Sequence, residues 1–195
     1  MRIVLKEFSL GESYLNCSEG LILEINEEDI VNLIVDKIGN EVTAVMLKNN
    51  ICLIYKPQEI KEVTEEIINR INMVINKDLI VLDNCIFVSV DDKNKISSLT
   101  ETQIEILRDM EILRRKWNVE CKLYKGENEV FSKILEVEAL HPHDALFMAD
   151  DLADNMFYTF ESLDAGMFVG SKVRNIEYVD KNTGDYFDCV LHILY

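Results

Sequence analysis

Short runs of apolar and β-branched residues, each closed by a tight polar turn, recur along the chain and limit the folds that are open to it. Two such runs near the end of the sequence, 173–179 and 186–194, flank the turn residues 181–184. Strands joined by turns this short pair antiparallel, because a parallel crossover needs a dozen or more residues. The pattern therefore predicts antiparallel sheet and not a doubly wound parallel sheet.

Other strands and a set of helices follow from the same kind of pattern. Further strands are expected at 2–8, 21–25, 42–47, 51–55, 79–82, 86–90, 119–124 and 130–139. Helical periodicity of the apolar residues predicts helices at 26–38, 57–75, 100–117 and 141–153. Thr100 and Gln103 fit a capping box, and Pro142 suits the first turn of the last helix. The expected fold class is α+β, with antiparallel sheet and about four packed helices.

The length of 195 residues fits one compact unit, 1–195, which divides most naturally into an N-terminal half, 1–95, and a C-terminal half, 96–195. In each half a strand leads into a helix and then a hairpin, and the strands 21–25 and 133–137 read alike. Two interpretations stay open. The halves are related copies of a ββαββ unit, or common pieces coincide by chance.

The charge balance excludes several classes of protein. The chain has 36 acidic and 20 basic residues, a net charge of −16, while 48% of its residues are hydrophobic. That apolar content argues against disorder, and the negative field argues against direct nucleic-acid binding. The one run of three basic residues, Arg114-Arg115-Lys116, is explained by the C-terminal end of the expected helix 100–117.

Cysteine usage and hydropathy indicate a cytoplasmic protein that neither enters a membrane nor binds zinc. No apolar stretch approaches the roughly 18 residues of a membrane span, and the N-terminal segment reads as a strand and not as a signal peptide. The cysteines are odd in number and widely spaced, without a Cys-x-x-Cys motif. They are Cys17, Cys52, Cys85, Cys121 and Cys189.

The segment His141-Pro142-His143-Asp144 is the most enzyme-like part of the sequence, and cysteine–histidine catalysis also stays open because such partners can be far apart in sequence. A His-x-His pair with aspartates nearby can ligate a metal or serve a hydrolase. The aspartates in question are Asp150, Asp151 and Asp154. The competing interpretation is that His141 caps a helix and Asp144 complements its dipole. With only one further histidine in the chain, we expect no metal and no cofactor.

A 38-residue stretch from Ile134 to Ser171 contains no Lys or Arg and holds eight acidic residues, half of the net charge. It is also rich in aromatic residues and methionine. Apolar anchors flanked by carboxylates are typical of an interface for a basic partner. The predicted partner-binding residues are Asp144, Asp150, Asp151, Asp154, Phe157, Tyr158, Glu161 and Asp164.

The resulting functional hypothesis is an acidic protein–protein interaction module that binds and inhibits a basic, nucleic-acid-handling protein. Its carboxylates would take the place of nucleic-acid phosphates. Immunity proteins against nucleases and phage inhibitors of host defence nucleases are proteins of this physical type. Two alternatives stay open: the hydrolase described above, and a structural or accessory domain whose aromatics fill the core while its aspartates face solvent.

Overall fold

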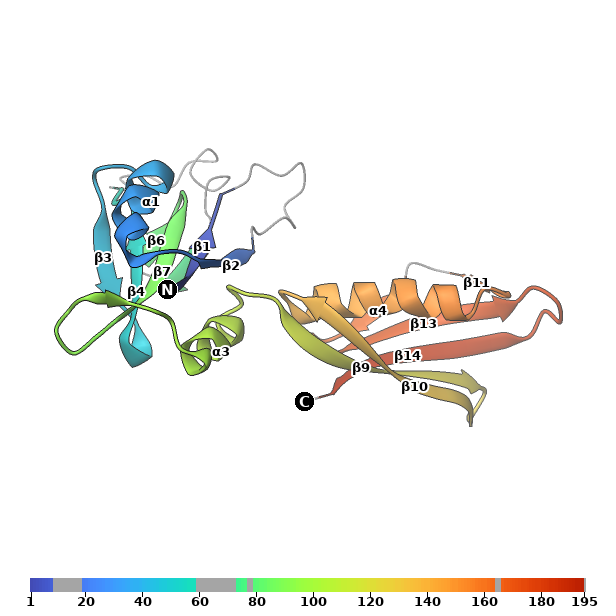
Figure 1. Ribbon diagram of the computed structural model, residues 1–195. Helices are drawn as coiled ribbons and strands as arrows, with labels where there is room; N and C mark the ends of the chain where they lie inside the picture. Colours follow the sequence, from blue (N-terminus) through green and yellow to red (C-terminus); the bar gives the residue numbers. More distant parts are fainter. Residues whose placement is uncertain (9–18, 59–72, 77–78, 164–165, 195) are drawn as a thin grey trace. The chain divides into compact units, whose positions relative to one another are not determined.

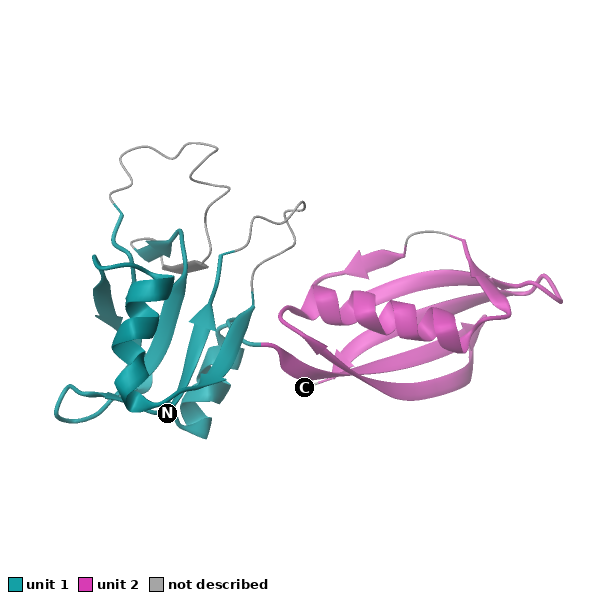
Figure 2. Cartoon of the chain, turned by 45° about the horizontal axis from the view of Figure 1, so that its top comes forward, with its two compact units in different colours: residues 1–113 teal, residues 114–195 magenta. Residues whose placement is uncertain are grey.

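A computed structural model describes residues 1–8, 19–58, 73–76, 79–163 and 166–194. The chain divides into two compact units, residues 1–113 (unit 1) and 114–195 (unit 2), shown in separate colours in Figure 2. Each unit has its own antiparallel sheet and its own apolar core. No helix in the described ranges is long and apolar enough to cross a membrane.

The main sheet of unit 1 is antiparallel and has the strand order β2-β1-β7-β4-β3, with β8 also paired to β7. These strands are β1 (Arg2–Lys6), β2 (Gly20–Glu24), β3 (Thr43–Met46), β4 (Ile51–Tyr55), β7 (Cys85–Val90) and β8 (Ile96–Ser97). A separate two-stranded sheet pairs β5 (Met73–Asn76) with β6 (Leu79–Val81). The three central strands, β1, β7 and β4, are almost entirely buried.

Helices cover both faces of the unit 1 sheet, which explains why its central strands are continuously apolar. On one face, α1 (Ile30–Lys37), which follows the short 3₁₀ helix η1 (Glu27–Asp29), packs over Ile54 and Ile86. On the other face, α3 (Glu101–Asp109) packs over Leu53 and Phe87. Successive residues of one strand therefore enter two different cores.

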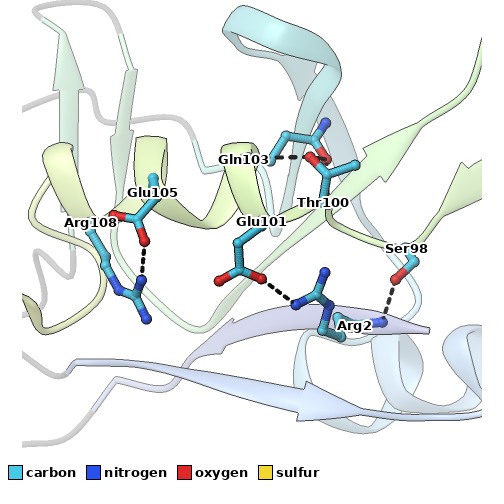
Figure 3. Close-up of polar contacts among 7 residues, drawn as sticks. All are labelled: Arg2, Ser98, Thr100, Glu101, Gln103, Glu105 and Arg108. Carbon is cyan, nitrogen blue, oxygen red and sulfur yellow. Dashed lines mark hydrogen bonds and ion pairs between the residues drawn. The ribbon is translucent and has the colours of Figure 1, made fainter.

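The predicted capping box of α3 is confirmed, and Figure 3 shows it together with its neighbours. The Gln103 backbone N–H donates to Thr100 Oγ1, while the Thr100 backbone N–H donates to Gln103 Oε1 at 2.9 Å. The Gln103 amide also donates to Ser89 Oγ on β7 at 3.0 Å. Arg2 Nη1 on β1 pairs with Glu101 Oε2 at 2.7 Å, so the helix start is tied to two strands.

Unit 2 is one antiparallel sheet with one helix lying along one of its faces (Figure 1). The strand order is β10-β9-β14-β13-β11, and β12 also pairs with β13. Ala145, Ala149 and Ala153 line the buried side of the helix, where small side chains allow close approach to the sheet. The elements are β9 (Arg115–Lys125), β10 (Asn128–Ala139), α4 (Pro142–Met156), β11 (Phe160–Ser162), β12 (Met167–Val169), β13 (Val173–Asp180) and β14 (Tyr186–Leu194).

The expected fold class, with about four packed helices, is wrong. The structure is mostly antiparallel sheet, with 47% strand and three short helices in the described part of the chain. The expected helix 100–117 ends at Asp109, because Glu111 takes the left-handed conformation (φ 57°) and β9 begins at Arg115. Val74 and Ile75, expected at the end of helix 57–75, lie in strand β5. Residues 59–72 of that expected helix lie outside the described residues.

The described units are also not two copies of one ββαββ unit. In unit 1, β7 lies between β1 and β4, and helices cover both faces. In unit 2, β9 pairs directly with β14, and α4 covers a single face. Segments 21–25 and 133–137 both lie mainly in strands, β2 and β10, but these strands have different neighbours in the two sheets.

The four described cysteines, Cys52, Cys85, Cys121 and Cys189, are buried free thiols, and Cys17 lies outside the described residues. Burial raises the pKa of the Cys85 thiol to about 12. At pH 8 only about one Cys85 in ten thousand would be a thiolate, the reactive form. We therefore expect iodoacetamide at pH 8 to leave the Cys85 peptide unmodified in the folded protein and to label it in urea, as measured by mass spectrometry. Equal labelling in both conditions would contradict this assignment.

Candidate functional site

The predicted partner-binding residues that the structure describes differ in their exposure and contacts. Asp150, Asp154 and Phe157 make contacts within unit 2. Asp151, Tyr158 and Glu161 are exposed, Asp144 is half-buried, and Asp164 lies outside the described residues. The segment thus combines internal contacts with an exposed remainder.

Asp150 forms an ion pair with Arg174 that joins α4 to β13. The carboxylate Oδ2 accepts from Arg174 Nε at 2.8 Å and lies 2.7 Å from Nη2, and the Arg174 side chain is 6% exposed. The guanidinium carbon lies 4.7 Å from the centre of the Phe147 ring and 4.9 Å from that of Phe168. A buried arginine with a carboxylate and two aromatic faces is fully committed to contacts inside the unit.

The surroundings of this pair leave little free space. A Cβ added at Gly166 would lie 2.9 Å from Arg174 Cζ, and Gly166 has a φ of +69°. Burial raises the pKa of the Asp150 carboxyl, and the Arg174 guanidinium opposes that rise. The ion pair therefore serves packing and orientation between α4 and β13.

Asp154 and Phe157 also make contacts within unit 2, although Asp154 is exposed and Phe157 is buried. The Tyr178 hydroxyl on β13 donates to Asp154 Oδ1 at 2.5 Å. Phe157 is 7% exposed and packs edge-on against the rings of Phe131, Phe160 and Tyr178. Phe157 is thus a core residue and is not free to anchor a partner.

The side of α4 that points away from the sheet carries a stripe of exposed and half-buried residues, and Asp154 is exposed beside it. Asp144, Met148, Asp151 and Asn155 follow at helical spacing on the side opposite the buried alanines, and Leu152 and Phe147 flank them. We call these six residues the outer face of α4. Its apolar members are well exposed, at 40% for Met148, 41% for Leu152 and 46% for Phe147. Just beyond the helix, Tyr158 is 79% exposed.

Side chains of the stretch from Ile134 to Ser171, which contains no Lys or Arg, also lie on both faces of the unit 2 sheet. Leu135 and Val137 of β10 are buried in the core beneath α4. Because side chains alternate along a strand, Glu136 and Glu138 lie on the other face of the sheet. Within the described residues, the acidic side chains that are close in sequence are therefore not a single patch in space.

The two histidines lie at the start of α4. His141 is the residue before the first helical turn, where its side chain makes no capping hydrogen bond, and Pro142 is in the first turn as predicted. The exposed His143 ring packs against Phe168, with ring centres 4.8 Å apart. Within the described ranges, no group of three or more His, Cys, Asp and Glu side chains is placed to hold a metal ion.

Sequence reasoning missed Arg174, Phe147 and Phe168. With Asp150 they form a cluster in which the Arg174 guanidinium contacts one carboxylate and two aromatic rings. A signal for Arg174 was present, because it alternates with Ile176 and Tyr178 on the buried side of an expected strand. A charged residue in that position needs a buried partner of opposite charge. Comparison of the chain with family models, with curated proteins and with solved structures found no match.

Proposed function

We propose that the chain is a protein-interaction module that binds a basic partner through the outer face of α4. The observation that supports this proposal is the exposure of Met148, which lies between Asp144 and Asp151 on α4, and of Leu152 beside them. Apolar side chains at the centre of an interface supply affinity, while carboxylates at its rim steer a basic partner and reject acidic ones.

The proposed partner is a nucleic-acid-handling protein, and the proposed effect is inhibition. Such proteins present clustered Lys and Arg to bind phosphates. Carboxylates held along a rigid helix would compete for the same cationic groups. The chain itself carries an excess of 16 negative charges, which adds long-range attraction to a basic surface.

We further propose that this binding takes place in the cytoplasm. Four cysteines are free thiols in the described structure. Free thiols that persist in a folded protein fit a reducing compartment, whereas secreted domains commonly pair their cysteines.

Zero-length carbodiimide crosslinking in an extract of the source cells tests the proposal. The reagent joins a carboxylate to a lysine amine, and the outer face of α4 offers carboxylates but no lysine. We expect Asp144 and Asp151 to be linked to lysines of a basic nucleic-acid-binding protein. Excess duplex DNA should reduce the yield, because it would occupy the same basic surface.

Two charge-reversal variants distinguish binding at the outer face of α4 from attraction to the overall negative charge of the chain. D144K/D151K should lower recovery of the partner at least about five-fold, because like charges would then meet at the rim. D92K/E127K makes the same change of charge at two exposed positions elsewhere and should leave recovery within about two-fold. Equal recovery with both variants, or crosslinks only to acidic proteins, would reject the proposal.

A further inference from the structure

Strand β10 forms one edge of the unit 2 sheet. It is 12 residues long, and within the described ranges it pairs only with β9. The opposite edge is formed by the three-residue strands β11 and β12. An edge strand presents a row of backbone N–H and C=O groups that can pair with an added strand, and proteins usually shorten or interrupt such edges.

The second part of β10 is a regular template. The register between β9 and β10 is irregular only between Glu129 and Phe131, and it is unbroken from Phe131 to Ala139. At the end of this part, the Ala139 carbonyl accepts from Trp117 Nε1 at 3.1 Å. The Lys133 side chain lies on the α4 side of the sheet, where its Nζ is 3.7 Å from Met156 Sδ. It therefore places no positive charge on the opposite face.

The side chains of β10 on the face opposite α4 are exposed, and two of them are acidic. Ile134 is 56% exposed, and Glu136 and Glu138 follow it at every second residue. In the sheet register, Glu138 faces Lys116 of β9, whereas Glu136 faces the neutral Asn118. An added strand would thus meet one apolar and two acidic positions in a row.

The charges decide which strand fits this edge. A second copy of the chain would bring its own acidic residues to the shared face, and like charges on neighbouring strands are destabilising. A strand with basic residues at alternate positions would instead place opposite charges beside Glu136 and Glu138. We infer that β10 binds an extended basic segment of a partner protein by strand addition, at a surface separate from the outer face of α4.

Two interactions define this mode of binding. Backbone hydrogen bonds between the partner and residues 132–138 supply the register, and the side chains Ile134, Glu136 and Glu138 select the partner. This inference deepens the proposed function, because it names the conformation of a basic segment. It does not depend on Asp144 or Asp151.

Binding of a labelled model peptide to the full-length chain tests the inference. The probe is an extended peptide of about nine residues with alternating Lys and Val, which matches the length of residues 131–139. Fluorescence anisotropy at low salt gives its affinity. The comparison probe has the same sequence with every second backbone nitrogen methylated, which removes the donors on one edge but keeps the charge. We expect methylation to weaken binding at least about ten-fold.

Protein variants then locate the site. E136K/E138K should weaken binding of the unmethylated peptide about ten-fold or more, whereas D144K/D151K should leave it within about two-fold. Equal affinity for the methylated probe would overturn the inference, because charge alone would explain binding. Binding lost only in D144K/D151K would also overturn it while supporting the α4 proposal. Failure of the alternating peptide to bind, or dimerisation of the chain through β10 in sedimentation experiments, would overturn it as well.

Discussion

Replacement of Arg174 with alanine is expected to remove a large share of the stability of unit 2. The change leaves the Asp150 carboxylate without its guanidinium and opens the space between the Phe147 and Phe168 rings. Breaking a buried ion pair from one side costs about 3–5 kcal/mol. A unit of about 80 residues is stable by only about 4–12 kcal/mol, so the loss is a large share of the total.

Urea unfolding followed by tryptophan fluorescence measures this effect selectively. Trp117 is the only tryptophan in the chain and lies in the unit 2 core. Lys181→Ala, an exposed change in the β13–β14 turn, serves as the control and should shift the midpoint little. The double variant D150L/R174M should recover part of the lost stability, because two apolar side chains leave no unpaired charge. If R174A behaved like the Lys181 control, the ion pair would not hold α4 to β13.

Replacement of Phe87 with alanine is expected to destabilise unit 1 strongly while the stability of unit 2 stays unchanged. Phe87 is 0% exposed and packs with Leu53, Ile104 and Leu107 between the sheet and α3. Truncating a buried phenylalanine costs about 3–5 kcal/mol, including the cavity that remains. Because the two units have separate cores, the loss should stay within unit 1.

Two signals recorded on one sample distinguish the outcomes. Circular dichroism of F87A should lose part of its strand signal at low urea, while the Trp117 fluorescence transition should keep its midpoint. Phe87→Leu, which nearly conserves volume, should cost less than about 1.5 kcal/mol and serves as the control. A Trp117 transition that moved together with the circular dichroism would show that residues 1–195 unfold as a single cooperative unit.

The features that were predicted correctly depend on a few neighbouring residues. The capping box of Thr100 and Gln103 needs only two residues three positions apart, and Pro142 in the first turn of α4 needs only one residue. The hairpin of β13 and β14 follows from two alternating runs around a short turn. Each of these features is predictable because its physical cause lies within a few neighbouring residues.

The errors arose where two local preferences compete. Residues 110–117 fit the end of a helix by their basic residues, but Arg115–Lys125 also alternates as a strand. The left-handed Glu111 and pairing of β9 with both β10 and β14 decide in favour of the strand. Pairing over such distances along the chain is not visible in a local window.

The candidate site was predictable as a segment but not as a surface. Helical spacing places Asp144 and Asp151 on one side of α4 and Asp150 and Asp154 on another. Which of these sides would meet β13 depends on how the helix packs on the sheet. That packing pairs Asp150 with the buried Arg174 and brings the exposed Asp154 within hydrogen-bond distance of Tyr178.

The covering of both faces of the unit 1 sheet has a consequence for its folding. A strand with one solvent-exposed face cannot shift its pairing register by one residue without exposing its apolar side chains. Strand β7 is apolar on both sides, so a shifted pairing would bury nearly the same surface. Its alignment depends on polar contacts at its two ends. Asn84 accepts from the Phe8 backbone N–H and donates to the Lys37 carbonyl, and Ser89 accepts from Gln103. These few hydrogen bonds therefore select one register of the apolar strand β7 over the registers shifted by one residue.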